Sequence, residues 1–176
     1  MTARKHSAFT LIELLVVIGI LAILLTIVLI AINPARQFAQ SNNTRRRSDI
    51  NAMLNAIHQY SVDNRGNITL LTIPQDNPLV AGSEALMIGS DVAGTPAQVD
   101  LCGFLVPTYI SALPVDPQYG FSTNDGVNQV DGAAVQVCTE AYDTQYSVVQ
   151  SNVATNIRIM VAAPRAELLE VIDVTR

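Results

Sequence analysis

The sequence predicts an α+β fold in which a long N-terminal helix packs on a small C-terminal antiparallel β-sheet. Three observations carry this prediction: an apolar run near the N-terminus, a helical-period apolar stripe after it, and short β-forming runs beyond Gly66. Turn-forming glycines and prolines separate those β-forming runs. The expected segments are a leader (1–8), an apolar helix (9–32), an amphipathic continuation (33–65) and a β-rich head (66–176).

Composition and charge narrow the function classes. The chain has 176 residues, of which 49% are hydrophobic and 14% charged, with a formal net charge of −5. That length suits one domain plus an appendage. From Gly66 onward the sequence holds twelve acids against three bases. Because such a region repels phosphates, nucleic acid is not indicated as a partner.

The apolar run Phe9–Ile32 has the properties of a membrane anchor. Its 24 residues are enough to cross about 30 Å of hydrocarbon as a helix. No small-x-small cleavage site follows the run, so we expect it to stay in the mature protein as a single span of the cytoplasmic membrane. Its only charged side chain is Glu13, although a carboxylate at a helix centre costs about 2.5–3.5 kcal/mol.

The segment after the apolar run predicts an amphipathic helix. Apolar residues recur at helical spacing from Ile50 to Tyr60, polar residues fill the other face, and Gly66 is suited to cap the helix end. Pro34 lies between this stripe and the apolar run. Because proline removes an intrahelical hydrogen bond, we expect a kink or a locally unwound turn at this point.

Three consecutive arginines, Arg45–Arg47, lie on the predicted amphipathic helix. We expect them to form a solvated face. Contacts with lipid headgroups, or with acidic groups of neighbouring protein chains, are the alternatives.

The two cysteines, Cys102 and Cys138, both lie in the acidic region. An even number of cysteines in an exported region favours a disulfide, and two buried thiols are the alternative. The bond would close a loop of about 37 residues and contribute roughly 4 kcal/mol in the chain-entropy model.

The motif search gives catalysis little support. The two histidines lie in the leader and on the predicted helix, and the chain has no G-x-S-x-G, G-x-x-x-x-G-K or H-E-x-x-H pattern. We therefore expect a protein that is not an enzyme and has no cofactor, apart from the calcium considered below.

The residues around Phe9 carry a family resemblance. The stretch SAFTLIELLVVIGILAILL closely resembles the processing and assembly segment of type IV pilins and pseudopilins. In that family a dedicated peptidase cuts a basic leader before a phenylalanine, whose new amine is then methylated. The resemblance implies cleavage between Ala8 and Phe9 and N-methylation of Phe9. Alanine stands at residue 8 where the family usually has glycine, and both residues are small. Residues Tyr109–Gly120 also look like the proline-aspartate segment of pseudopilin-like members.

The resemblance implies the pilin fold and a structural role. The chain would be a subunit of a type IV pilus-like filament, a helical homo-oligomer that forms through the N-terminal helix. Glu13 of an incoming subunit would meet the Phe9 amine of its neighbour, and the helix would locally unwind near Pro34 when packed. The implied partners are a prepilin peptidase and methyltransferase, a membrane assembly platform, and the lipid bilayer before assembly. After assembly the subunit would lie in an extracellular filament at the cell surface.

Two other functions stay open at this stage. The chain could serve as a pseudopilin of a type II secretion or DNA-uptake system, which shares the same processing segment. It could also be a membrane-anchored binding module that never polymerises.

A loop in the predicted head offers candidate calcium ligands. Some pseudopilins that this chain resembles bind calcium in the corresponding region, and calcium takes 6–8 oxygen ligands. Ordinary turns use the same residue types, and the spacing is not that of an EF-hand. The candidates are Asp116, Asn124, Asp125 and Asp131.

Overall fold

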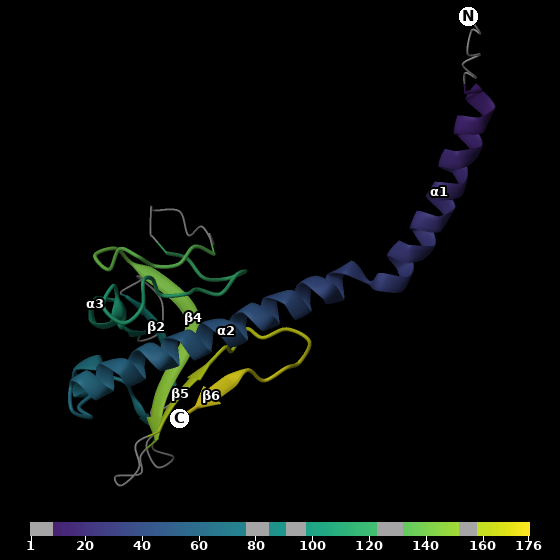
Figure 1. The fold of residues 1–176 in the computed structure, drawn as a ribbon. Helices are drawn as coiled ribbons and strands as arrows, with labels where there is room; N and C mark the ends of the chain where they lie inside the picture. Colours follow the sequence, from purple (N-terminus) through teal and green to yellow (C-terminus); the bar gives the residue numbers. More distant parts are fainter. Residues whose placement is uncertain (1–8, 77–84, 91–97, 123–131, 152–157) are drawn as a thin grey trace, which may run out of the picture. The chain divides into compact units, whose positions relative to one another are not determined.

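The computed structural model describes residues 9–76, 85–90, 98–122, 132–151 and 158–176 (Figure 1). The chain forms two compact units, Met1–Ala39 and Gln40–Arg176. The first unit contains helix α1 (Leu11–Ile32) and the beginning of helix α2 (Pro34–Asp63). The second unit contains the rest of α2 and the sheet, and we call its part after α2 the head.

Helix α1 is apolar on every side. Its 22 residues include one charged side chain, Glu13, in the first turn. Within α1, which is described throughout, no side chain is buried. A helix that is hydrophobic all round needs a lipid or protein environment, so the chain alone does not satisfy this surface.

The two helices are separated by a single residue with left-handed backbone. Asn33 has φ +47°, and α2 begins at the next residue, Pro34. The N–H of Arg36 donates to both the backbone oxygen and the side-chain Oδ1 of Asn33, at 3.1 and 3.3 Å. The expected interruption is confirmed, but Pro34 occupies the first helical position. There its missing N–H costs nothing, so the penalty of an interior proline does not apply.

Helix α2 is amphipathic, as predicted. It ends in a turn where Gly66 has φ +85° and its N–H donates to the oxygen of Ser61 at 2.7 Å, a cap that satisfies one of the last carbonyls. Its buried apolar residues are Ile50, Met53, Leu54, Ala56, Ile57 and Tyr60.

The sheet of the head is mixed, which corrects the expected antiparallel arrangement in one respect. Its strands are β1 (Gln75–Asp76), β2 (Leu86–Ser90), β3 (Gln98–Val99), β4 (Tyr142–Ser151), β5 (Ile159–Ala162) and β6 (Asp173–Thr175). Their order is β3-β2-β4-β5-β6, with β1 also paired to β4. The β2–β4, β4–β5 and β5–β6 pairs are antiparallel. The two shortest strands each pair in parallel with a longer one: β1 pairs with β4, and β3 pairs with β2. A 3-10 turn (Thr69–Leu71) precedes β1, and helix α3 (Cys102–Leu105) lies between β3 and β4.

The core of the head lies between α2 and one face of the sheet, which α2 crosses in Figure 1. The apolar stripe of α2 and the buried residues of β4, such as Tyr146 and Val148, belong to one continuous cluster. Burying one large aliphatic side chain contributes about 1.5–3 kcal/mol. Hydrophobic burial therefore holds the sheet on the C-terminal half of α2.

Candidate functional site

Glu13, the acidic residue of α1, is hydrogen-bonded to Thr10, the residue that caps the N-terminus of the helix. The Glu13 carboxylate accepts the Thr10 backbone N–H at 2.9 Å and the Thr10 hydroxyl at 2.7 Å. The Glu13 N–H in turn donates to the Thr10 hydroxyl oxygen at 3.3 Å. This reciprocal arrangement is a capping box, which satisfies backbone donors that the first turn of a helix leaves free.

The capping box gives the Glu13 carboxylate two donors within its own chain. The carboxylate also lies in the first turn, where the positive end of the helix dipole stabilises an anion. The sequence contains the signal for this contact, because Thr10-x-x-Glu13 at the start of an apolar run is the capping-box pattern.

Helix α1 as a whole has the properties of a membrane-inserted segment. Helix α1 is long and apolar enough to cross a bilayer. The one hydroxyl in its second half, that of Thr26, donates to the oxygen of Ala22 at 2.8 Å and is thereby satisfied within the helix. Phe9 is exposed, and Ala8 lies outside the described residues.

The head contains a buried ion pair that sequence reasoning missed. Arg46 on α2 donates through Nε to Asp116 Oδ2 at 2.7 Å and through Nη2 to Oδ1 at 3.1 Å. Neither side chain is exposed to solvent. Burial acts to lower the pKa of Arg46, but the hydrogen bonds and charge of Asp116 outweigh it and raise that pKa. Asp116 also accepts the backbone N–H groups of Gln118 and Tyr119.

Two neighbours of Arg46 hold the loop before β6. The Asn43 side chain accepts the N–H of Glu167 at 3.0 Å and donates to its oxygen at 2.8 Å, as a backbone partner would. Arg47 pairs with Glu170 at 2.7 Å. The prediction that all three arginines face solvent is therefore wrong for Arg46, which is buried. Arg47 is partly exposed, as predicted, but it also pairs with Glu170. No pattern in the sequence indicates which arginine is buried, because the acidic partners are far away along the chain. Asp116 lies 70 residues from Arg46, and Glu170 lies 123 residues from Arg47.

Helix α2 is also hydrogen-bonded to the central strand of the sheet, β4. The Tyr146 hydroxyl on β4 donates to Asp49 Oδ2 at 2.9 Å. Burial raises the pKa of Asp49, against the opposing effects of this hydrogen bond and of Arg45. Burial, together with the charge of Asp49, also raises the pKa of Tyr146. The more buried polar contacts of α2 thus fall between residues 43 and 49, whereas the exposed Asn55 farther along accepts a hydrogen bond from Arg176 Nη1 at 2.7 Å.

The candidate calcium ligands are only partly described. Asn124, Asp125 and Asp131 lie outside the described residues. The Asp116 carboxylate is engaged by Arg46 and two backbone N–H groups, so it serves the ion pair in this structure. Among the residues that the structure describes, no group of three or more His, Cys, Asp or Glu residues is placed to hold a metal ion. Calcium binding stays a prediction.

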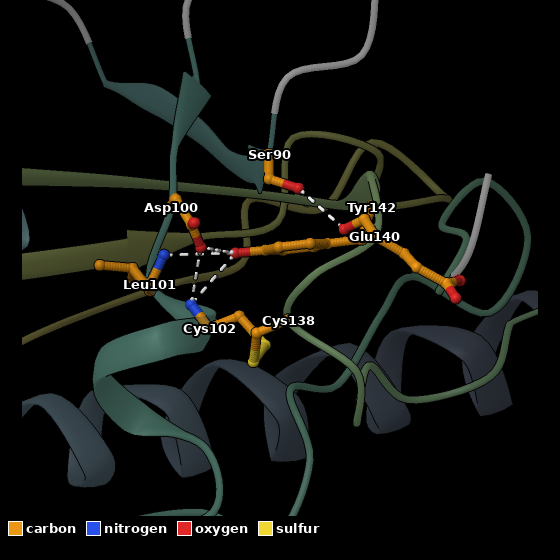
Figure 2. The surroundings of a disulfide bond; sticks show 7 residues. All are labelled: Ser90, Asp100, Leu101, Cys102, Cys138, Glu140 and Tyr142. Atoms are coloured by element: carbon orange, nitrogen blue, oxygen red, sulfur yellow. Dashed lines mark hydrogen bonds between the residues drawn. A yellow bond between two sulfur atoms is a disulfide. The ribbon is translucent and has the colours of Figure 1, made fainter.

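The predicted disulfide joins Cys102 and Cys138, whose Cα atoms are 5.4 Å apart (Figure 2). Beside it the Tyr142 hydroxyl donates to Asp100 Oδ1 at 2.7 Å and accepts the backbone N–H groups of Leu101 and Cys102. Burial, together with Asp100, raises the pKa of Tyr142. These contacts hold the turn that begins α3 against β4.

The comparisons with known proteins identify the N-terminal segment. Residues 3–29 match the family model described as the prokaryotic N-terminal methylation motif. This is the prepilin-type signal of type IV pilins and pseudopilins, a class of structural proteins. No curated protein and no solved structure matches the chain.

Proposed function

We propose that this chain, which carries the prepilin-type signal, is a structural subunit of a type IV pilus-like filament. The observation that carries the proposal is the position of Glu13, in a capping box at the start of a helix whose surface is apolar on every side. A helix of this kind is satisfied by lipid before assembly and by copies of itself afterwards. The head has its own core, so it needs no membrane.

In the proposed assembly Glu13 exchanges partners. Cleavage between Ala8 and Phe9 creates a positive amine on Phe9, one residue before Thr10 and four residues before Glu13. In the waiting subunit Thr10 supplies the hydrogen bonds of the carboxylate. In the filament the Phe9 amine of a neighbouring subunit pairs with it. The attraction between the two charges is strong in a low-dielectric core, and desolvation offsets much of it, so the pair acts mainly to set the axial position of each subunit.

The same proposal assigns a function to the break between α1 and α2 at Asn33 and Pro34. A residue before proline avoids helical backbone, so the interruption is built into the sequence. Locally unwound backbone here lets the packed helix adapt to its neighbours in the filament core. The proposed location is the cytoplasmic membrane before assembly and the cell surface after it, with a prepilin peptidase and a membrane assembly platform as partners.

The mature N-terminus tests the proposal. Protein purified from the producing cells should begin with N-methylated Phe9 by mass spectrometry, and the same cells should carry filaments that contain it. Mature protein that begins at Met1 would overturn the proposal. Processed protein that stays monomeric after detergent extraction, in cells without filaments, would instead favour a membrane-anchored binding module.

A pseudopilin of a secretion or DNA-uptake system is the second candidate, because the prepilin-type signal is common to pilins and pseudopilins. Deleting the gene separates these roles. Loss of surface filaments favours a pilus, loss of exported enzymes favours a secretion system, and loss of transformation favours DNA uptake.

A further inference from the structure

We propose that Arg46 is the residue that fixes the position of the head along α2. In this role it is a positioning residue: the apolar stripe supplies the burial, and the buried pair with Asp116 decides which turn of the helix the head occupies. The inference stands on the contacts of the head and does not require the filament.

The apolar stripe by itself is a poor determinant of position. Apolar residues recur every three or four positions along α2, so a shift by three residues would put an apolar side chain at four of its six buried apolar places, with Asn51 at the place of Leu54 and Arg47 at that of Ile50. A shift by three residues would bring Ile50, Leu54 and Ile57 to the places of Met53, Ile57 and Tyr60. Each of these places would stay apolar.

The polar residues of α2 have no such substitutes. The same shift would bring Asn43 opposite Asp116 and leave the buried carboxylate without its cation. It would also place Arg47 where Ile50 is now fully buried. Both changes leave a buried charge unpaired, which costs several kcal/mol per ion.

The geometry of the pair makes it selective. Two nitrogen atoms of Arg46 meet the two oxygen atoms of Asp116, an arrangement that requires both direction and distance. A buried ion pair is often no more stabilising than apolar residues of similar volume, and its best-attested use is to specify register. The fully buried pair therefore contributes mainly to the choice of position, and the stripe contributes mainly to stability.

The position matters for assembly if the proposed function holds. It decides how many residues of α2 precede Asn43, whose side chain is hydrogen-bonded to Glu167 of the head. Subunits whose heads sat one turn apart on α2 would present different surfaces to their neighbours. A fixed position gives every copy the same surface.

Spin labels test the position directly in the full chain in detergent. Two label pairs, Gln59→Cys with Thr139→Cys and Gln59→Cys with Asp173→Cys, measure α2 against different parts of the head. All three sites are exposed, and both native cysteines are in the disulfide, so labelling is specific. A shift by one turn displaces α2 by about 5 Å along its axis.

The test variant removes the pair without leaving a charge. Arg46→Met with Asp116→Asn deletes both charges and keeps the side-chain oxygen that accepts two backbone N–H groups. The matched control is Arg47→Met with Glu170→Gln, which removes a half-exposed pair of the same chemistry from the adjacent residue. We expect a second distance, shifted by up to about 5 Å in at least one label pair, in the test variant. The control should show the single distance of the unmodified chain.

A folded test variant with only the original distances would overturn the proposal, because the stripe and the remaining polar contacts of α2, such as those of Asn43 and Asp49, would then suffice without Arg46. If the test variant does not fold, the same distances are measured in Arg46→Lys. Lysine keeps the charge of Arg46 but cannot make the two-point contact with Asp116. A second distance in Arg46→Lys supports the positioning role, and a single unchanged distance overturns it. Absence of filaments from the unmodified chain would contradict the proposed function and leave these distances unaffected.

Discussion

Arg46 and Asp116 form a two-point ion pair from which solvent is excluded on both sides. The residues are 70 positions apart in sequence. The pair joins α2 to the turn after Leu113, and Asn43 beside it holds the loop before β6. One short stretch of helix therefore anchors two loops, one of which is also bonded to the sheet through the Asp116 N–H and the oxygen of Thr144 on β4.

Breaking the pair from one side should destabilise the head strongly. Arg46→Ala leaves the Asp116 carboxylate buried and unpaired, so we expect a loss of about 3–5 kcal/mol in the free energy of unfolding. Arg45→Ala is the matched control: its side chain is half exposed, so we expect a loss of less than about 1 kcal/mol. Denaturant unfolding of the full chain in detergent measures both. Equal losses in the two variants would contradict the structural role of Arg46.

Substitutions of Glu13 separate the capping contact from the charge. Glutamine also forms a capping box, so Glu13→Gln should keep the helix start intact. In the proposed assembly the charge is required, so both Glu13→Gln and Glu13→Ala should insert and be cleaved normally yet give few or no filaments. Glu13→Asp, one methylene shorter, should assemble weakly.

The measurement is filament yield in cells without a second copy of the subunit. If Glu13→Gln gives normal filaments and Glu13→Ala does not, the carboxylate acts as a helix cap alone. Wild-type yield from Glu13→Ala would show that the residue has no part in assembly.

The break between α1 and α2 should depend on Pro34. Pro34→Ala frees Asn33 to adopt helical backbone, so we expect more helix by far-UV circular dichroism. The gain in free energy should stay well below the roughly 3 kcal/mol of an interior proline, because Pro34 is the first residue of α2. Fewer or stiffer filaments are expected. Gly19→Ala is the control, since an added Cβ there meets nothing within 4 Å. Filaments of unchanged number and stiffness from Pro34→Ala would remove the proposed role.

Stability should respond to pH through Asp49. Its folded pKa is raised by burial, so between that value and the ordinary aspartate pKa of about 3.9 the folded state binds more protons than the unfolded state. The contribution of Asp49 to the free energy of unfolding therefore increases as the pH falls through this window. Asp49→Asn, which keeps an acceptor for Tyr146, should be more stable than the unmodified chain at pH 7.

The difference between Asp49→Asn and the unmodified chain should shrink as the pH falls. Thermal unfolding at a series of pH values measures it, with Asp173→Asn, an exposed carboxylate of β6, as the control. A difference that stays constant from pH 7 to pH 4 would show that the proton of Asp49 is not linked to folding.

The local features of this protein follow from neighbouring residues, and the sequence by itself determined them. The span of α1 needs only consecutive apolar residues, and the break before Pro34 needs only the backbone restriction that proline imposes on Asn33. The stripe from Ile50 to Tyr60 is a periodicity that one helix expresses without help. The capping box was also present in the sequence, as Thr10-x-x-Glu13, although its partner assignment required the structure.

The polar anchors of the head were decided only by tertiary structure. A run of three arginines has no periodicity that tells which one is buried, because its partners, Asp116 among them, come from distant turns. The short parallel strands escaped prediction for the same reason, since two-residue strands such as β1 and β3 exist only where β4 and β2 offer free backbone groups. Local patterns report the geometry of a single element, whereas a buried charge is stable only at the place where the fold brings its counterion.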